Sequence, residues 1–556
     1  EAIAAVREEA WPQAGNADEL HEALMGLACL TTDEARGHPH WNSWLADLAK
    51  AGRATRLEGE VVLWLPVERL AAFRALYPQA LCTPPLSIPE DHDQLWDPDE
   101  ARVEILRARL SAFGPLSLAQ IAEPLALPAA PCSQALVRLE AQGYVLRGRF
   151  SPGATEEQWC ERHLLARIHR YTVKRLRREI EPVERADFMR FLFDWQRLSP
   201  GTRGEGAAAL AAVLEQLEGY QAAAGAWEQE LLPARVAGYA GHWLDELCRS
   251  GRLVWLRQAG RSQSAAGAVR GTPVMLLPRR QLSLWTALGA GGAAPNPSLR
   301  AQRVLDALGR QGALFFDELL SEAHLLRSEL ENALGELVAL GLVNADSFAG
   351  LRALLAPASK RGRGARRPRH SALIGGMDDA GRWALLRRPE ASPEVPPARR
   401  PAIAGESLEH IARVLLRRYG VVCWRLLERE ADWLPSWREL LRVYHRLEAR
   451  GEIRGGRFVN GLSGEQFALP EAVALLREVR RRGPDGSLVA LSAADPLNLV
   501  GTLLPGHKVP VLAGNRLVYR DGVPVAVTLA GKAELLVELD ADTAAQVRQR
   551  LTQRPG

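Results

Sequence analysis

The sequence predicts a mainly α-helical chain with small β wings (α+β), built as a tandem array of five winged-helix domains followed by a small β-barrel. The first observation is a pattern, Leu-x-x-x-Gly, that ends five amphipathic helices and is followed each time by a short apolar run. A glycine just past a helix favours the left-handed conformation that ends it, and the chain then continues as a strand, as a recognition helix continues into its wing. These glycines are Gly52, Gly143, Gly251, Gly341 and Gly451. They lie about 90 to 110 residues apart, which fits whole small domains and not solenoid repeats.

The second observation is a change of pattern after Ser487, where short apolar runs alternate with turns. The expected strands are residues 488–491, 509–512, 516–520, 523–529 and 533–539. Asp521-Gly522 lies between two of them and is a strong hairpin signal. We expect a small barrel or curled sheet, closed by a helix over 542–551 that has Asp540 or Asp542 as its N-cap.

These patterns divide the chain into six segments. The expected domains are residues 1–95 (first winged helix), 96–158 (second), 159–290 (a connecting basic helix and the third), 291–400 (the fourth, with a basic insertion and a linker), 401–483 (the fifth) and 484–556 (the β-rich tail). The Pro-rich stretch 82–89 is expected to be a linker.

Composition sets the broad class of the protein. At 556 residues, with 47% apolar and 24% charged residues, the chain is typical of a soluble globular protein with several cores. It contains no signal peptide and no apolar run of about 18 residues, so we expect a cytoplasmic protein without a membrane segment. Its six cysteines are scattered without a C-x-x-C pair, which favours reduced thiols over disulfides or a structural zinc.

Other motifs exclude some activities. No phosphate-binding G-x-x-x-x-G-K-[ST] loop is present, so we expect no ATP-driven motor and no cofactor within these residues. Because the sequence starts at Glu1 and not at methionine, we expect a piece excised from a longer polypeptide. The histidines form no H-E-x-x-H motif and no i, i+4 pair, so no metal site is expected.

Charge favours a nucleic-acid partner without requiring one. The net charge is +4, from 70 basic and 66 acidic residues. The strongest basic feature is a predicted helix over 163–180. Its helical spacing puts four cations on one stripe and a mostly apolar set on the opposite face. The cations are Arg167, Arg170, Lys174 and Arg178, and the opposite set is Leu165, Ile168, Thr172 and Leu176.

Four cations could follow a phosphate backbone, and binding through all of them would give a slope of log affinity against log salt of roughly −3.6. The alternative is a solvated face that is partly paired with Glu179 and Glu181.

Two further groups of cations are candidates for DNA contact. The first is Lys360, Arg361 and Arg363, in a run of six cations within residues 360–369. This run is alternatively a flexible solubilising loop. The second group lies on the expected wings of the second and fifth units, where wings commonly touch the backbone or minor groove and where ordinary solvation is the alternative. Its members are Arg147, Arg149, Arg454 and Arg457. The fifteen tryptophans mostly have helical spacing, which favours core packing over base stacking.

The chain resembles the C-terminal region of the bacterial large helicase-related protein family. The resemblance rests on five stretches, residues 159–170, 181–183 with 186–191, 232–236, 492–501, and 514–516 with 520–524. It implies a DNA-repair helicase whose ATPase core precedes this region in the polypeptide. It further implies tandem winged helices ending in a β-barrel, self-association into a homotetramer, and a place in the bacterial cytoplasm close to the nucleoid.

Residues 210–255 also resemble AlkZ-type winged-helix DNA glycosylases. Those enzymes carry a Gln-x-Asp or Gln-x-Gln pair where this chain has Gln221, Ala222 and Ala223. An Asp or Gln at the second position would stabilise an oxocarbenium-like sugar or orient the attacking water, which a methyl group does not. Gln221 therefore matches, and Ala223 departs from the pattern.

Base excision in this chain would need another carboxylate, acting on a base flipped from the stack. Asp495 and Asp521 are the candidates, because they lie in the most family-like part of the tail. Both are also positions where Asp is common for structural reasons, Asp495 before Pro496 and Asp521 at the start of a turn.

The leading hypothesis is a DNA-binding, oligomerising module of a DNA-repair helicase, which grips single-stranded or duplex DNA mostly through the backbone. The first alternative is a DNA glycosylase module that excises a damaged or deaminated base such as uracil. The second alternative is a protein-interaction scaffold.

Overall fold

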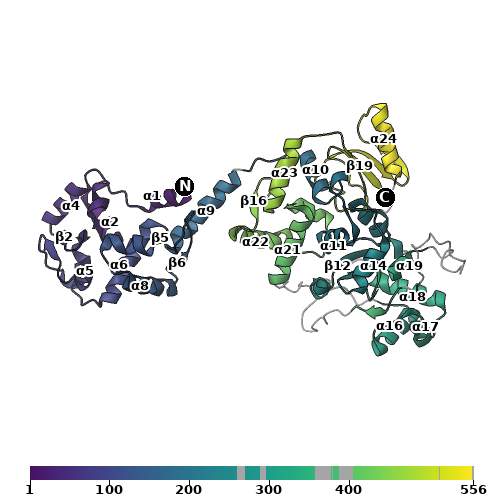
Figure 1. Cartoon of the computed structure of the whole chain (residues 1–556), viewed down its shortest axis with the longest axis horizontal. Coiled ribbons are helices and arrows are strands. Elements are labelled where there is room, and N and C mark those ends of the chain that lie inside the picture. The colour runs from purple at the N-terminus through teal and green to yellow at the C-terminus, as the bar shows by residue number, and fades with distance from the viewer. Residues whose placement is uncertain are drawn as a thin grey trace. The chain divides into compact units, whose positions relative to one another are not determined.

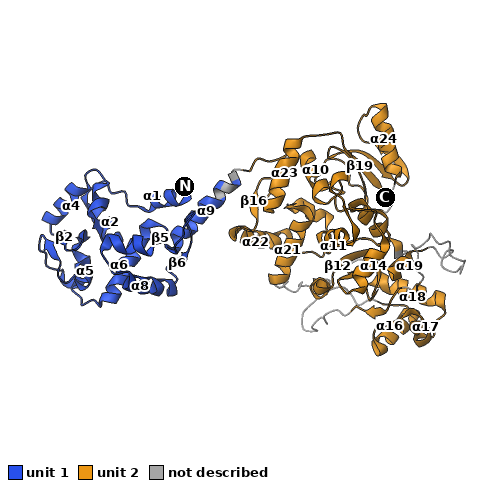
Figure 2. Ribbon diagram, in the orientation of Figure 1, with its two compact units in different colours: residues 1–179 blue, residues 180–556 orange. Residues whose placement is uncertain are grey.

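The computed structural model describes residues 1–178, 180–258, 269–288, 296–356, 377, 380–386, 405–512 and 514–553, and it is mostly helical with several small sheets (Figure 1). The chain divides into two compact units, residues 1–179 and residues 180–556 (Figure 2), and each is described separately. The described helices include none that is long and apolar enough to cross a membrane. All six cysteines are free thiols, and five of them are buried.

The first part of unit 1 is a helical cluster with a four-stranded sheet. Its elements are α1 (Ala2–Ala10), α2 (Ala17–Leu27), β1 (Leu30–Thr31), α3 (Thr32–Arg36), α4 (Trp41–Lys50), β2 (Ala54–Glu58), β3 (Val62–Pro66), α5 (Leu70–Leu76) and β4 (Leu81–Thr83). The strand order is β1-β3-β2-β4. The linker predicted from Cys82 is wrong at its start, because Leu81–Thr83 pairs with β2 and so belongs to the sheet.

The second part of unit 1 has a three-stranded sheet of order β5-β7-β6. Its elements are α6 (Pro98–Phe113), β5 (Leu116–Ser117), α7 (Leu118–Ala122), α8 (Ala129–Ala141), β6 (Val145–Gly148), β7 (Gln158–Glu161) and α9 (Arg162–Arg178). The wing expected for the second unit contains strand β6, and the predicted basic helix is α9. Leu164 and Ile168 of α9 are buried together with Val6 of α1.

Unit 2 begins with α10 (Arg185–Trp195), followed by another helical part with a three-stranded sheet of order β11-β12-β9. Its elements are β8 (Gly204–Glu205), α11 (Gly206–Gln216), β9 (Ala222–Ala223), α12 (Ala224–Ala226), a π-helical turn (Trp227–Leu231), α13 (Leu232–Arg235), β10 (Val236–Ala237), α14 (Gly241–Arg249), β11 (Leu253–Leu256), β12 (Pro273–Pro278) and α15 (Leu282–Leu288). Strands β11 and β12 pair antiparallel, and β11 is the apolar run that follows Gly251.

The next segment of unit 2 comprises α16 (Leu299–Gln311), α17 (Phe316–Ala323), α18 (Arg327–Leu340), β13 (Val343–Ala345), α19 (Phe348–Leu355) and β14 (Trp383–Leu385). Strand β13 pairs with β14, and Leu314 bridges to Trp383 of the same strand. The basic run of this segment, with Lys360, Arg361 and Arg363, lies outside the described residues.

The segment before the tail has a three-stranded sheet of order β15-β17-β16. Its elements are α21 (Gly405–Tyr419), β15 (Val421–Val422), a 3-10 turn (Trp424–Arg429), α22 (Trp437–Ala449), β16 (Arg454–Gly456), β17 (Gln466–Ala468) and α23 (Pro470–Arg482). Helix α22 ends at the fifth Leu-x-x-x-Gly motif, so it occupies the position of a recognition helix in front of the β16–β17 wing.

The tail is an open antiparallel sheet of order β18-β19-β20-β21, and no closed barrel is found among its described residues. Its elements are β18 (Leu488–Ser492), β19 (Arg516–Arg520), β20 (Val523–Leu529), β21 (Lys532–Leu535) and α24 (Ala541–Thr552). The Asp540 side chain accepts a hydrogen bond from the Thr543 N–H and is the N-cap of α24, as predicted.

One predicted strand of the tail, residues 509–512, is wrong. Two asparagine side chains bind carbonyl groups of this segment, Asn498 at Val509 (3.1 Å) and Asn515 at Pro510 (3.1 Å). Pro510 has no N–H to donate to a neighbouring strand. The segment therefore stays irregular although it is apolar.

The five glycines of the Leu-x-x-x-Gly motifs all have left-handed backbones, with φ between +66° and +75°. After four of them, the next N–H donates to the carbonyl of the leucine that begins the motif, at 2.9–3.0 Å. This is the hydrogen bond of a Schellman helix end. The helix-to-wing transitions are therefore confirmed at the level of the backbone, while the count of five winged-helix domains stays a prediction.

Candidate nucleic-acid interface

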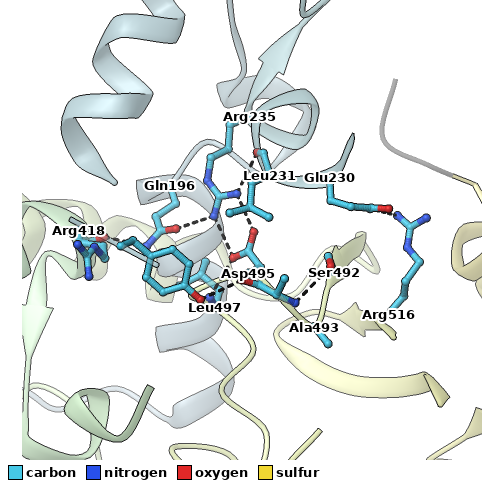
Figure 3. Close-up of polar contacts among 12 residues, drawn as sticks. Gln196, Glu230, Leu231, Arg235, Arg418, Ser492, Ala493, Asp495, Leu497 and Arg516 are labelled. Carbon is cyan, nitrogen blue, oxygen red and sulfur yellow. Dashed lines mark hydrogen bonds and ion pairs between the residues drawn. The ribbon is translucent and has the colours of Figure 1, made fainter. Parts of the chain in front are cut away.

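Asp495, a candidate catalytic carboxylate, lies in the turn after β18 and is buried in an ion pair (Figure 3). Its two carboxylate oxygens accept hydrogen bonds from both terminal nitrogens of Arg235 in α13, at 2.7 and 2.9 Å. The Leu497 N–H also donates to Asp495 Oδ1 at 2.9 Å. The Asp495 and Arg235 side chains are 2% and 0% exposed. A carboxylate held in this way is poorly placed to take a proton from water, so the geometry favours a structural role.

Gln196 and Arg418 extend this buried network. Arg235 donates to Gln196 Oε1 (2.7 Å), and the Gln196 amide donates to the Arg418 carbonyl (2.9 Å). The Arg418 guanidinium donates to the Glu430 carboxylate and to the Glu218 carbonyl. The network thus joins parts of unit 2 that are distant in sequence, and each buried arginine in it has its charge compensated.

The tyrosines beside this network are held neutral. The Tyr220 hydroxyl donates to the Ala494 carbonyl at 2.9 Å, and burial raises the pKa of Tyr220 to about 12. The Tyr419 hydroxyl donates to Glu430 at 2.7 Å, and burial likewise raises the pKa of Tyr419. Both phenols act as hydrogen-bond donors that close the network, and neither is positioned as an acid or base.

Gln221 follows Tyr220 and directly precedes β9. It is half-buried, and among the described residues it has no hydrogen-bond partner. Ala223, at the position of the second polar residue in the glycosylase pattern, pairs with Pro273 of β12. The two positions of the glycosylase pattern therefore carry one amide, of Gln221, and one methyl group, of Ala223.

Asp521 begins the β19–β20 turn, where its φ is +51° and that of Gly522 is +80°. Its Oδ1 accepts hydrogen bonds from the N–H groups of Asp485 and Gly486, both at 2.9 Å. Asp521 thus tethers the chain segment that enters β18. Among the described residues, no hydrogen bond or ion pair joins Gln221, Asp495 and Asp521 to one another.

Of the basic stripe predicted on helix α9, the side chains of Arg167 and Arg170 are described. Arg167 and Tyr171 both donate to the Glu9 carboxylate of α1, at 2.5 and 2.6 Å, and these two hydrogen bonds lower the pKa of Glu9. Arg170 is exposed and has no ion-pair partner among the described residues. The side chains of Lys174 and Arg178 lie outside the described residues. The expectation that Thr172 is on the buried side is wrong, because Leu164 and Ile168 form that side and Thr172 is exposed.

The two predicted wings differ. On β6, Arg147 lies near the carboxylates of Glu157 (3.4 Å) and Glu140 (3.9 Å) and over the Trp159 ring. Arg149 is exposed, with no ion pair to any described residue. On the β16–β17 wing, Arg454 and Arg457 are both exposed, and neither is paired within the described part of the chain.

Three arginines that the sequence reading missed lie on α22. Arg438, Arg442 and Arg446 are all exposed, and no ion pair links them to another described residue. Their i, i+4, i+8 spacing on a helix that ends at Leu-x-x-x-Gly was the available signal, because residues four apart share a helix face. The same helix buries Leu440, Val443, Tyr444 and Leu447.

Other features of the described residues do not suit phosphate or metal. An open hollow of about 410 Å³ beside α17 is lined by Asp317, Glu318 and Glu322, among others, and its carboxylates would repel phosphate. Among the described residues, no group of three or more His, Cys, Asp or Glu side chains is placed to hold a metal ion.

Comparison with known proteins identifies the family that the chain resembles. Residues 183–279 and 402–488 each match a winged-helix domain of large helicase-related protein. The chain resembles the C-terminal region of large helicase-related proteins. The first domain match contains Gln221 and Arg235, and the second contains α22 and the β16–β17 wing.

Two relatives carry the name Lhr, for large helicase-related. The Lhr helicase/probable uracil glycosylase of Mycolicibacterium smegmatis is 31% identical over 460 residues, covering 77% of this chain and 29% of the relative. The Lhr helicase/uracil glycosylase of Escherichia coli is 29% identical over 475 residues, with the same coverage of 77% and 29%. The chain thus spans about 29% of the length of these Lhr relatives. Among solved structures, the Streptomyces sahachiroi DNA glycosylase AlkZ aligns with a TM-score of 0.37 and 15% identity, covering 67% of this chain and 96% of AlkZ.

Proposed function

We propose that this chain is a DNA-binding module of a DNA-repair helicase, linked in one polypeptide to an ATP-dependent helicase core. The observation that carries the proposal is the winged-helix domain at residues 402–488, whose wing exposes Arg454 and Arg457 without a paired carboxylate in the described part of the chain. The Lhr relatives named as helicases support the link to a helicase core.

The mode of binding follows from the chemistry of these cations. A guanidinium group is always charged at neutral pH and donates two parallel hydrogen bonds to a phosphate. Contacts of this kind position a protein on DNA without reading sequence, and they release condensed counterions. The proposed module therefore grips DNA mainly through its backbone, with an affinity that falls steeply as salt rises.

A salt titration of binding tests this proposal. The whole chain is titrated with fluorescently labelled duplex and single-stranded oligonucleotides between roughly 50 and 200 mM salt, the range over which phosphate contacts change affinity most visibly. We expect binding at low salt and a linear fall of log affinity with log salt. Negligible affinity for both DNA forms at low salt would contradict the proposal and would favour a protein-interaction scaffold.

Self-association is part of the same proposal. We expect a homotetramer, because the family resemblance implies one. Sedimentation equilibrium of the whole chain at micromolar concentration measures the assembly mass directly. A mass of about 61 kDa at every concentration, the mass of one chain, would contradict it.

Base excision is the second candidate function, and the printed names of both Lhr relatives favour it. Within this chain, Gln221 is the group to test, since it has no hydrogen-bond partner among the described residues. The experiment incubates a panel of uracil-containing and alkylated oligonucleotides with the chain and then cleaves abasic sites with alkali. Product that disappears in Gln221→Ala supports excision at this position, and no product across the panel contradicts excision.

A further inference from the structure

Helix α22 presents three exposed arginines along one face, which they share with the exposed His445 and Ala449. Arg438, Arg442 and Arg446 repeat every four residues, so they form a stripe along one side of the helix. The opposite side packs Leu440, Val443 and further side chains into the core of unit 2. The orientation of the stripe is therefore fixed by burial of the other face, and the cations point to solvent.

The wing is attached to the same helix and adds two more cations. The chain leaves α22 through Gly451 and enters β16, which carries Arg454, and Arg457 follows directly. Glu448, in the last turn of α22, accepts a hydrogen bond from the Gly455 N–H at 3.0 Å. This bond holds the start of the wing against the end of the helix, so the five arginines belong to one structural element, the helix with its wing.

The carboxylates of this element are engaged in other contacts. Glu439 binds the N–H and hydroxyl of Ser436 as the capping box that starts α22. Glu448 is buried and holds Gly455, as described above. Glu465 of the wing is paired with His445, at 3.1 Å. None of these carboxylates forms an ion pair with the five arginines within the described part of the chain.

The aromatic side chains of α22 are unsuited to stack on bases. Trp437 and Tyr444 lie against each other, with ring centroids 5.7 Å apart, and Tyr444 also stacks on Phe467 of β17. Proteins that take single strands usually present free aromatic faces beside their cations. This face offers cations without such a platform, which favours duplex over single-stranded nucleic acid.

We propose that the arginine stripe of α22 and the β16–β17 wing form one binding face for the backbone phosphates of duplex DNA. Residues 438 to 446 cover about 12 Å along a helix, which matches the width of the major groove of B-DNA, about 12 Å. Arginines at the two ends of the stripe reach phosphates on both strands, and the wing arginines take phosphates beyond the groove. The inference rests on the proposed DNA-binding function and names the surface that carries it.

The test compares two triple variants of the whole chain. One is Arg438→Ala/Arg442→Ala/Arg446→Ala. The control is Arg477→Ala/Arg481→Ala/Arg548→Ala, which removes three exposed arginines of α23 and α24 that have no ion pair to a described residue. Both variants lower the net charge by the same amount, so they separate a specific face from general electrostatic attraction. Thermal unfolding of both checks that the fold is retained.

We expect the α22 variant to bind duplex DNA roughly 100-fold more weakly at 0.1 M salt, and its salt slope to fall in magnitude by about 2.7. The control is expected to stay within a few-fold of the unmodified chain. Arg454→Ala/Arg457→Ala on the wing is a second, independent variant and should lower the slope by about 1.8.

Three results would overturn the inference while leaving the proposed function intact. These are equal losses in the two triple variants, duplex binding by the α22 variant within twofold of the unmodified chain, or a clear preference of the unmodified chain for single strands. Failure of the unmodified chain to bind either form of DNA would instead overturn the proposed function itself.

Discussion

The arginines of unit 2 fall into two groups that differ in exposure and in partners. Arg235 and Arg418 lie in the interior, and each is matched by a buried carboxylate and by further hydrogen-bond acceptors. Arg438, Arg442 and Arg446 lie on the surface of α22 without an ion pair to another described residue. Burying a charge is unfavourable unless it is compensated, so the first group has its ligand built into the fold. The second group has donors available for a ligand from outside.

Of the substitutions that test this difference, replacement of Asp495 is expected to change the free energy of unfolding most. Asp495→Ala leaves Arg235 as an uncompensated buried charge, which is expected to lower the free energy of unfolding by about 3–5 kcal/mol. Urea unfolding followed by tryptophan fluorescence measures the loss. The double variant Arg235→Met/Asp495→Leu is the control, because replacing both partners by apolar groups should recover most of it. Unchanged stability together with lost base excision would instead make Asp495 a catalytic residue.

The buried Glu218 side chain is expected to make the stability of unit 2 depend on pH. Burial alone would raise its pKa, but hydrogen bonds from His410 (2.7 Å) and Trp285 (2.9 Å) lower the pKa below the usual 4.5. Ionised Glu218 therefore stabilises the fold above the pKa of the unfolded chain, and this contribution is lost as pH falls through the lower folded pKa. We expect Glu218→Gln to be about 1–3 kcal/mol less stable at pH 7. The deficit should shrink at pH 4, and an equal deficit at both pH values would show that ionisation is not involved.

Glu9 of α1 in unit 1 provides an intermediate case, because it pairs with Arg167 at an exposed position. Glu9→Gln is expected to leave the free energy of unfolding nearly unchanged, as exposed pairs contribute little. It should also strengthen DNA binding at low salt roughly twofold, since a negative charge is removed beside the cations of α9. Fluorescence titration with duplex DNA measures this change, and weaker binding in the variant would contradict it. Glu8→Gln, a neighbouring carboxylate of the same helix, is the matched control for charge alone.

Arg442→Ala is expected to have the smallest effect on stability, and it should reduce the salt dependence of DNA binding. Because Arg442 is exposed and unpaired within the described residues, the free energy of unfolding should stay within about 0.5 kcal/mol. The slope of log affinity against log salt should fall in magnitude by about 0.9. Arg477→Ala is the single-residue control, and a loss of stability above that margin would place Arg442 with the interior group.

Local features of this fold could be predicted from the sequence, because their causes lie within a few residues. The left-handed glycines at 52, 143, 251, 341 and 451 follow from the way a helix ends. Strands β19 and β20 follow from alternation around Asp521-Gly522, and their predicted bounds agree with the structure. The predicted strand at 509–512 failed because side chains of Asn498 and Asn515, outside the apolar run, bind its carbonyl groups.

The candidate site was harder to predict because its decisive contacts link distant parts of the chain. Asp495 and Arg235 are 260 positions apart, and no spacing rule connects them. Without Arg235, an aspartate in a family-like stretch suggests chemistry as readily as structure. The α22 stripe was accessible in principle, since its four-residue spacing is local. It does not stand out in the sequence, because arginines distributed along an amphipathic helix resemble an ordinary solvated face.

The ion pair between Arg235 and Asp495 also determines how early unit 2 can complete its folding while the chain is being synthesised. A ribosome releases Arg235 long before Asp495, and the Arg235 guanidinium needs that carboxylate to be buried without a large penalty. The Gln196 side-chain amide likewise lacks its acceptor, the Arg418 carbonyl, until about 220 further residues have been made. Unit 2 therefore cannot complete its interior during synthesis of its first half. Its early segments remain incompletely packed until the turn that holds Asp495 has been made.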